Sequence, residues 1–340
     1  MDRLTRITVS ELICKYPIAL DFLTNSNLHK LDRQVPFVDM IELLDSETLM
    51  EFGIDKGELT EQFLLFLNTF TGNMDTETSV DSLTIIGGHN KTKEMEDISL
   101  TIQRGEVISI VGPTGSGKSR LLGDIECLAQ KDTPTARQIL INGILPTEEE
   151  RFSLSGRLVA QLSQNMNFVM DLSVMEFLTM HARSRLCEDT ESVCQRCFAC
   201  ANELAGEKFS EDTKVTQLSG GQSRALMIAD TAYMSSSPIV LIDEIENAGI
   251  DRKEAIKLLA SHDKIVFMST HDPLLALYAS RRIVIRNGGI HKVLTTEEEE
   301  KQSLSCIEGL DRELLAIRNR LRLGERISLS ETEAFHVATL

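Results

Sequence analysis

Residues 112–119 restrict the fold of this 340-residue chain more than any other feature. They follow a short apolar run, Val107–Val111, and read Gly-x4-Gly-Lys-Ser. Glycines at this spacing let backbone amides surround phosphate groups, and a helix that begins at the lysine adds the positive end of its dipole. The sequence therefore predicts a strand, a phosphate-binding loop and a helix in an α/β domain. The loop consists of Gly112, Pro113, Thr114, Gly115, Ser116, Gly117, Lys118 and Ser119.

Two carboxylates follow a second apolar run, Ile239–Ile242. The carboxyl ends of parallel strands meet at one edge of a sheet, so we expect Asp243 and Glu244 beside the phosphate loop. The Ser119 hydroxyl and the Asp243 carboxylate are predicted to ligate Mg²⁺, which prefers oxygen donors. Lys118 is predicted to reach the β- and γ-phosphates of a nucleotide, and Glu244 to polarise the attacking water.

A third short sequence, Leu218-Ser219-Gly220-Gly221-Gln222, lies between these two motifs. With the three motifs in this order, residues about 80–295 are identified as a member of the ATP-binding-cassette (ABC) ATPase family. The resemblance implies a nucleotide-binding domain with a mixed sheet core and a helical subdomain at about 165–220. It also implies that the third motif caps the γ-phosphate of an ATP held by a second copy of the chain, through Ser219 and Gly221.

The same resemblance implies further site residues. Gln164 precedes Leu172-Ser173-Val174 at the family's spacing and matches the glutamine that senses Mg²⁺ and water, with Gln161 as the less well-spaced alternative. Asp251 matches the loop that passes between two ATP sites, and His271 matches the switch histidine that contacts the γ-phosphate. Because the chain holds one copy of each motif, we expect a homodimer with two ATP molecules between its subunits.

The chain departs from the family pattern at three places. The family stacks adenine on an aromatic ring before the phosphate loop, but no Phe, Tyr or Trp occurs between Phe70 and Phe152. His89 is the candidate substitute, and selectivity for adenine over guanine stays open. After the catalytic glutamate, this chain has Ile245 where the family usually has proline. The loop that ends at Asp251 reads Ala-Gly-Ile-Asp instead of the family's common Ser-Ala-Leu-Asp. These departures indicate an outlying branch that keeps the catalytic positions.

Helical and strand patterns divide the chain into three parts. Residues 1–74 predict a small all-α domain with a capping box at Thr8 and Glu11, and Gly72–Thr78 reads as a linker. Residues 80–295 predict the ATPase domain, and 296–340 a tail with an amphipathic helix at Leu304–Leu323. That helix either packs on the main domain or contacts a second subunit. Strands are expected at 98–102, 107–111, 139–141, 158–161, 239–242 and 265–268, helices at 37–44 and 58–70, and a hairpin at 282–293.

The N-terminal part resembles the small helical domain found beside hybrid-cluster-type redox proteins of anaerobes. The matching segments are Ile7–Leu12, Lys15-Tyr16-Pro17, Phe22-Leu23 and Asn27-Leu28. That family often carries a cysteine pair just after the last match, whereas this chain has none between residues 29 and 34. The expected role of this domain is therefore docking and not redox chemistry.

Four cysteines are close together in the sequence. Cys194, Cys197 and Cys200 have the spacing of metal ligands, and Cys187 could add a fourth thiolate for zinc or an iron–sulfur cluster. The same three-residue spacing places small apolar residues along one face of a helix, and we prefer this second interpretation.

Charge and hydropathy limit the classes of partner. The formal net charge of −17 argues against nucleic acid, which proteins bind mainly through Lys and Arg. No apolar run approaches the ~20 residues that a transmembrane helix needs, and the N-terminus lacks the apolar core of a signal peptide. We expect a cytoplasmic protein, peripheral at the inner face of the membrane if it serves a transporter.

Three functions remain open from the sequence. The first is a soluble, non-transport ATPase that acts on a partner protein such as a metalloenzyme or redox enzyme. The second is the ATP-binding subunit of a membrane transporter that docks on a separate permease near Gln164. The third, a chromosome-associated ATPase, fits the acidity least. The added N-terminal domain, the variant motifs and the cysteines lead us to favour the first, although most single-cassette members of the family serve permeases.

Overall fold

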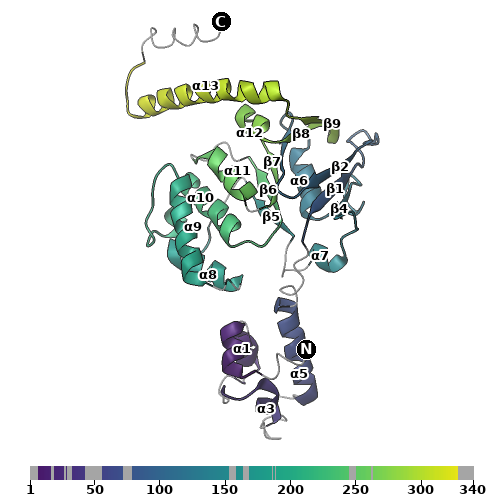
Figure 1. Ribbon diagram of the computed structural model, residues 1–340, viewed down its shortest axis with the longest axis vertical. Coiled ribbons are helices and arrows are strands. Elements are labelled where there is room, and N and C mark those ends of the chain that lie inside the picture. The colour runs from purple at the N-terminus through teal and green to yellow at the C-terminus, as the bar shows by residue number, and fades with distance from the viewer. Residues whose placement is uncertain are drawn as a thin grey trace.

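The computed structural model describes most of the chain, and every statement below concerns the residues it describes. These are residues 7–16, 19–26, 28, 33–42, 56–71, 79–152, 158–163, 168–185, 187, 189–244, 250–261 and 263–327. Figure 1 gives the order of the helices and strands along the chain.

A six-stranded sheet forms the centre of the part that follows the N-terminal helices. Its spatial order is β5-β6-β7-β3-β8-β9; the first five strands are parallel, and β9 runs antiparallel to β8. The strands β3, β6 and β7 therefore end at the same edge, where the phosphate loop and the two carboxylates follow them. The bounds are β3 Val107–Val111, β5 Val159–Leu162, β6 Ile239–Asp243, β7 Ile265–Ser269, β8 Arg281–Arg286 and β9 Gly289–Thr295.

Three further strands form a separate antiparallel sheet in the order β2-β1-β4. They are β1 (Ser82–Ile86), β2 (Ser99–Gln103) and β4 (Gln138–Ile141). β2 alternates buried and exposed residues as its sequence predicts. β1 was not predicted from the sequence, because its three central residues are all buried and show no alternation.

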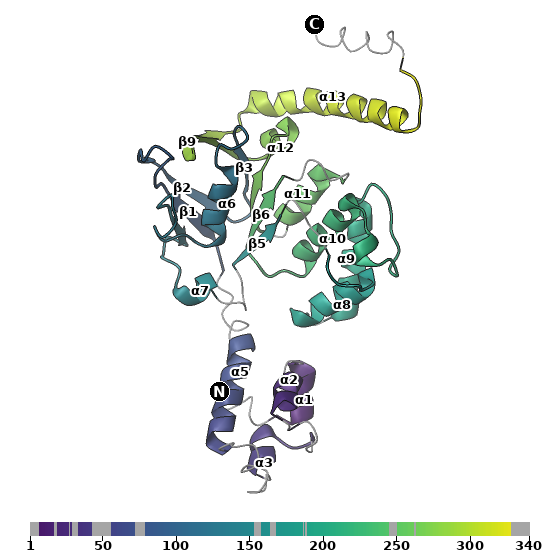
Figure 2. The ribbon, with the colours of Figure 1, turned by 180° about the vertical axis from the view of Figure 1, so that it is seen from behind.

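Alternate residues of the six-stranded sheet belong to two different cores. In β3, Ile108 and Ile110 face one core with the three-stranded sheet and α6 (Lys118–Glu126). Val107, by contrast, belongs to a core with α10 (Gly220–Tyr233), α11 (Arg252–Ser261) and α12 (Pro273–Tyr278). This period of two is the geometry of a strand covered on both faces. The layers on either side of the sheet can be followed in Figure 2.

The segment between β5 and β6 is helical. It contains α8 (Val174–Ser184), α9 (Thr190–Leu204), a 3₁₀ turn at Val215–Gln217 and α10. One core joins α8 and α9 to the buried face of α10. Ser173 and Glu176 form a capping box that fixes the start of α8.

The N-terminal helices have a core of their own. They are α1 (Val9–Lys15), α2 (Ala19–Asn25), α3 (Phe37–Glu42) and α5 (Lys56–Thr71), and the Thr8–Glu11 capping box begins α1 as predicted. Phe37 stacks on Phe63 with ring centroids 3.7 Å apart. The predicted linker at 72–78 lies outside the described residues. The domain boundaries at 74, 80 and 296 stay predictions.

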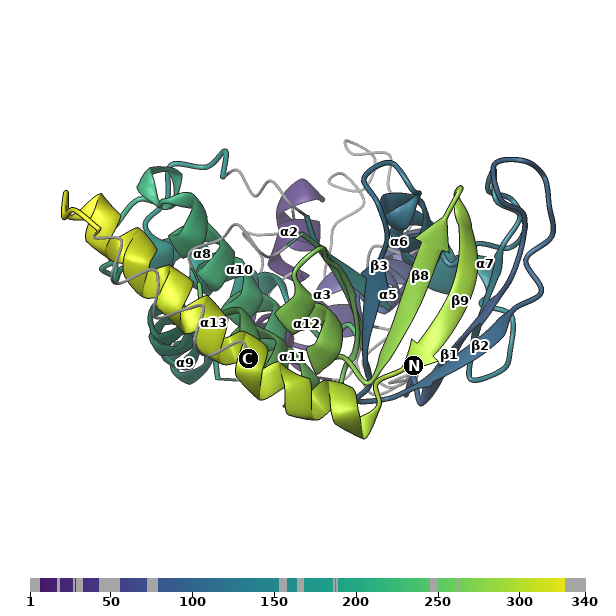
Figure 3. The same cartoon turned by 90° about the horizontal axis from the view of Figure 1, so that it is seen from above.

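The C-terminal helix α13 (Glu298–Arg322) lies across α12, as Figure 3 shows. Ion pairs join it to the cassette at Lys253–Glu308 (2.6 Å) and Arg252–Asp311 (2.9 Å). This observation supports the first of the two placements that its sequence left open, while contact with a second subunit stays a prediction. Within the described part of the chain, no helix combines the length and apolarity that a membrane span requires.

Candidate functional site

The phosphate loop joins β3 to α6 as its sequence predicts. Gly117 is the N-cap of α6 and has φ +110°. Because glycine has no side chain, it leaves the first backbone amides of the helix without a side-chain acceptor. A Cβ on Gly117 would lie 2.9 Å from the Cα of Gly288, so only glycine fits. The Lys118 ammonium donates to the Gly112 carbonyl at 3.0 Å. The Lys118 side chain thus lies over its own loop. Phosphate oxygens bound there would be stronger acceptors for its ammonium group than the Gly112 carbonyl is.

Ser116 gives this loop an unmet hydrogen-bonding group. Its hydroxyl is buried and has no hydrogen-bond partner among the described residues. Its oxygen lies close to Gly112, where a Cβ would come within 2.8 Å of it, and Ser116 does not line the hollow beside the loop. The curled backbone and the helix N-terminus, and not this hydroxyl, are the features that suit an anion such as a phosphate group.

The two carboxylates follow β6 at the same edge of the sheet. Glu244 has φ +50°, in the left-handed region that costs a non-glycine residue about 1–2 kcal/mol. Its amide donates to the Ser269 carbonyl of β7 at 3.1 Å, which holds this conformation. Backbone strain of this kind concentrates at functional sites, where the surrounding structure maintains it.

Glu244 and the phosphate loop line one hollow of about 710 Å³. The structure therefore brings the predicted catalytic carboxylate to the predicted phosphate site. His89, the candidate substitute for the missing aromatic ring, is not among the described residues that line the hollow. The lining residues are Lys91, Thr114, Gly115, Gly117, Lys118, Ser119, Arg120, Gly123, Asp124, Cys127, Thr133, Pro134 and Glu244.

His271 lies at the same edge because β7 is the neighbour of both β3 and β6. Ser269 of β7 is in register with Ile110 of β3 and with Asp243 of β6. The Thr270 amide donates to the Ile110 carbonyl at 3.1 Å, and the following His271 is exposed. Three strands that are neighbours in the sheet, β6, β7 and β3, thus bring the carboxylates, the histidine and the phosphate loop to one edge.

Two of the three predicted Mg²⁺ ligands are described. Ser119 is an exposed hydroxyl at the start of α6, and Asp243 is a half-buried carboxylate at the end of β6. Both are oxygen donors of the type that Mg²⁺ prefers, so the donor set fits this ion. The third, Gln164, lies outside the described residues. The alternative, Gln161, lies within β5, where its amide can donate to the Glu126 carboxylate at 2.9 Å.

The third motif lies at the start of α10, apart from the phosphate loop. Ser219 is the N-cap of this helix, and it forms a reciprocal capping box with Gln222. Gly220 and Gly221 form the first turn. None of these residues lines the hollow around the phosphate loop of the same chain, as far as the structure describes it. This separation is what a site shared between two copies requires.

Asp251 lies at the start of α11. Its amide donates to the Leu204 carbonyl at 3.0 Å, and its carboxylate accepts from the Glu254 amide at 3.0 Å. It lines a second hollow of about 440 Å³, among α11, α12 and α13, and not the hollow of the phosphate loop. The loop residues before it, 245–249, lie outside the described residues.

The cysteine segment packs as a helix face. Cys194 and Cys197 are buried in α9 beside Ala201, and burial raises the pKa of both thiols. Cys187 and Cys200 pack against the same core, and burial raises the pKa of these thiols too. Among the described residues no group of three or more His, Cys, Asp or Glu side chains is arranged to hold a metal ion. The zinc or iron–sulfur alternative therefore has no support, and the helix-face interpretation accounts for the spacing.

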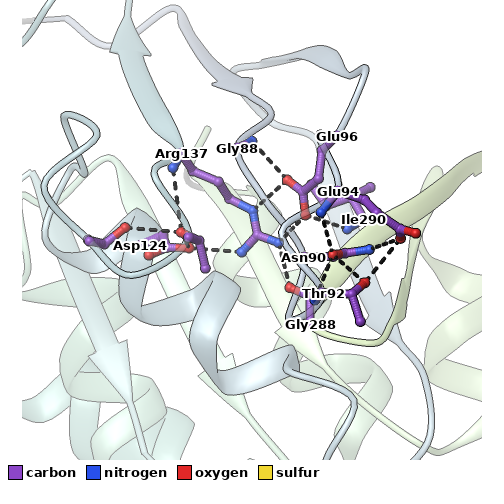
Figure 4. A network of polar contacts seen from close by, with 11 residues as sticks. Gly88, Asn90, Thr92, Glu94, Glu96, Asp124, Arg137, Gly288 and Ile290 are labelled. Atoms are coloured by element: carbon purple, nitrogen blue, oxygen red, sulfur yellow. Dashed lines mark hydrogen bonds and ion pairs between the residues drawn. The ribbon is translucent and has the colours of Figure 1, made fainter.

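The buried Arg137 lies beside the site, and the sequence analysis did not identify it. Arg137 has no exposed surface; it donates to both carboxylate oxygens of Glu96 (2.9 and 2.6 Å), to Asp124 (2.8 Å) and to the Gly288 carbonyl (2.9 Å), as Figure 4 shows. Asp124 belongs to α6, and Gly288 to the β8–β9 turn. Arg137 therefore ties the helix of the phosphate loop to that turn. A single arginine before β4 gives no sequence pattern from which these contacts could be predicted.

Comparisons with known proteins agree with this geometry. Residues 95–247 match the ABC transporter family. The chain is 52% identical over 250 residues to an uncharacterized ABC transporter ATP-binding protein of Methanocaldococcus jannaschii, covering 73% of this chain and 95% of the relative. The family match begins after the N-terminal helices. It therefore gives no support to the resemblance of these helices to a redox-associated domain.

Two further comparisons concern a longer relative and a solved structure. The macrolide export ATP-binding/permease protein MacB of Aggregatibacter actinomycetemcomitans is 32% identical over 230 residues; the match covers 65% of this chain but only 34% of that protein. The solved structure of an ATP-binding subunit of an ABC transporter matches with a TM-score of 0.51 and 21% identity, over 65% of this chain and 92% of that one. This last match supports the fold alone.

Proposed function

The chain belongs to the ABC transporter family of ATP-binding proteins, which are P-loop ATPases, and from this we propose that it energises a membrane permease. The observation that carries the ATPase part of the proposal is that the phosphate loop and Glu244 line the same hollow. It supports hydrolysis of a bound nucleoside triphosphate. The names of the relatives, which refer to transporters, favour the permease over the soluble protein client that the sequence analysis preferred.

We assign the chemistry to the phosphate loop and to residues at or after the ends of β5, β6 and β7 in the sequence. The phosphate loop binds the triphosphate through its backbone amides, with Lys118 as its main cation. Glu244 orients and polarises the attacking water, and His271 contacts the γ-phosphate. Ser119, Asp243 and Gln164 would hold Mg²⁺, which neutralises charge on the phosphate oxygens when it is bound.

The second copy of the chain completes each site. Ser219, Gly220, Gly221 and Gln222 of one subunit would cap the γ-phosphate on the phosphate loop of the other, and Asp251 would lie between the two sites. The location of this motif away from the phosphate loop of its own chain supports the homodimer. ATP closes the dimer through charge-assisted hydrogen bonds, and hydrolysis weakens them.

The test is capture of the partner by a variant that does not hydrolyse ATP. Glu244→Gln protein is purified from its native cells with Mg-ATP, from membrane and soluble fractions separately, and the bound proteins are identified by mass. A multi-span membrane protein in near one-to-one ratio supports the proposal. A soluble enzyme that is released when ATP is removed would overturn it in favour of a protein client. Lys118→Ala, which should not retain ATP, is the matched control and should capture neither.

A further inference from the structure

We propose that Lys91 is a second nucleotide-binding cation, which contacts the phosphate chain from the outer side of the phosphate loop. The inference rests on the proposed ATP site and deepens it. Lys91 lies in the segment between β1 and β2 and lines the same hollow as Lys118 and Glu244. Its ammonium donates to the Gly115 carbonyl at 2.9 Å. Lys118 and Lys91 thus lie on carbonyl groups of one loop, from two different parts of the chain.

The backbone of Lys91 is fixed by the β8–β9 turn. Its amide donates to the Asn287 carbonyl at 2.9 Å, and the amide of Gly288 donates to the Ser116 carbonyl of the phosphate loop at 2.7 Å. A Cβ on Gly288 would lie 2.7 Å from the Cγ of Lys91, so the glycine leaves room for the lysine side chain to pass. The turn therefore holds Lys91 and the phosphate loop in one arrangement.

The segment around Lys91 is ordered by its own hydrogen bonds. The Asn90 side-chain oxygen accepts from the amides of Thr92 (2.9 Å) and Glu94 (3.0 Å), contacts visible in Figure 4. Beneath it, Glu96 accepts from the Gly88 amide at 3.1 Å and forms the buried pair with Arg137. Arg137 also donates to the Gly288 carbonyl. A cation held at a fixed place loses less conformational freedom when it binds an anion.

The composition of the hollow points to phosphate and not to the base. Its described lining has no aromatic ring, and its cations are Lys91, Lys118 and Arg120. Of its two carboxylates, Asp124 is already paired with Arg137. Binding should therefore depend on the charge of the triphosphate more than on stacking of a purine. The substrate class that we infer is the nucleoside triphosphates with weak selectivity between adenine and guanine.

Calorimetric titration of the full chain separates the possible outcomes. The probes are the slowly hydrolysed analogues Mg-ATPγS and Mg-GTPγS and inorganic tripolyphosphate, each with wild type, Lys91→Gln, Lys91→Arg and the control Lys93→Gln. Lys93 is exposed in the same segment but does not line the hollow. We expect Lys91→Gln to raise the Kd of all three probes roughly tenfold, the size of one lost charge-assisted bond. Lys91→Arg should retain most of the affinity, and Lys93→Gln all of it.

Two results would overturn the assignment of Lys91. One is wild-type affinity in Lys91→Gln; the other is loss of affinity for the nucleotides with unchanged affinity for tripolyphosphate, which would move the contact to the sugar or base. Failure of the proposed function is a different result. In that case wild-type protein itself would not bind Mg-ATPγS, or Lys118→Ala would bind it as well as wild type.

Discussion

The Arg252 guanidinium donates to the Asp311 carboxylate at 2.9 Å and thereby joins the first residue of α11 to the C-terminal helix. The same guanidinium also pairs with Asp272, which caps α12 and directly follows His271. One side chain thus connects α13 to the loops that carry Asp251 and His271. The C-terminal helix is therefore attached at the side of the cassette that we propose to respond to ATP.

Loss of the Asp311 contact alone and loss of both Arg252 contacts are expected to have different effects. Asp311→Asn removes only the contact with α13, a partly exposed pair worth about 1 kcal/mol or less, so it should speed hydrogen exchange in α13 with ATP turnover within about twofold. Arg252→Gln also releases Asp272 and should lower turnover several-fold. Exchange by mass spectrometry and steady-state ATPase assays measure both effects. Lys257→Gln, at an exposed pair on α11, is the control; equal turnover in the two test variants would contradict the interpretation.

Glu244→Gln should retain ATP and lose turnover. The amide keeps the size of the side chain but cannot polarise water, so we expect the rate to fall by about 100-fold or more. With Mg-ATP the variant should elute as a dimer in gel filtration, and without nucleotide as a monomer. Asp243→Asn should instead raise the Mg²⁺ concentration needed for half-maximal turnover, because it removes the charge of a proposed Mg²⁺ ligand. An unchanged rate in Glu244→Gln would refute the role of this carboxylate.

Local patterns predicted much of the site. The phosphate loop, the strand before the two carboxylates and the capping box at Thr8 each depend on residues a few positions apart, so the sequence displays them directly. The β8–β9 hairpin was predicted from Asn287-Gly288-Gly289 for the same reason. β1 was missed because a strand buried in its centre has no alternation, and a short apolar run does not distinguish strand from helix.

The supporting contacts of the site could not be predicted in this way. Lys91 meets Gly115 across 24 positions, and Arg137 meets Glu96 across 41, so no periodicity relates them. The sequence offered one hint for Lys91. It is a cation close to the position where the family usually has the aromatic residue that this chain lacks. The cysteine spacing was ambiguous for a different reason, since metal sites and helix faces share a separation of three residues.

The buried cysteines are expected to be unreactive and free of metal. Burial raises the pKa of the Cys194 and Cys197 thiols, so almost no thiolate is present at neutral pH. In native protein a thiol reagent should modify the exposed Cys306 and leave these two until the protein unfolds. Metal analysis of anaerobically purified protein should find no stoichiometric zinc or iron. Rapid modification of Cys197 in the native state, or one bound metal per chain, would contradict the helix-face packing.

Glu96 is expected to stabilise the cassette at neutral pH and to lose this effect in acid. Burial acts to raise the pKa of Glu96, but the hydrogen bonds and charge of Arg137, with the Gly88 and Ile290 amides, hold it below the ordinary value of 4.5. A carboxyl whose pKa is lowered by folding contributes its stability above the unfolded pKa and loses it as the pH falls through the folded value. Glu96→Gln leaves the buried Arg137 with only Asp124 as a charged partner and should reduce the free energy of unfolding at pH 7 by about 3–5 kcal/mol.

Urea unfolding at pH 7 and at pH 4 measures both parts of this prediction. The stability difference between wild type and Glu96→Gln should be large at pH 7 and should begin to narrow as the pH falls below about 4.5. The unfolded carboxyl then takes up a proton, while the folded carboxyl stays ionised until the pH reaches its lower pKa. Glu148→Gln, an exposed glutamate of α7 (Glu148–Phe152), should follow wild type at both pH values. If Glu96→Gln were as stable as wild type at pH 7, the Arg137 pair would not be what holds α6 and the Gly288 turn together. The fixed position of Lys91 would then need a different explanation.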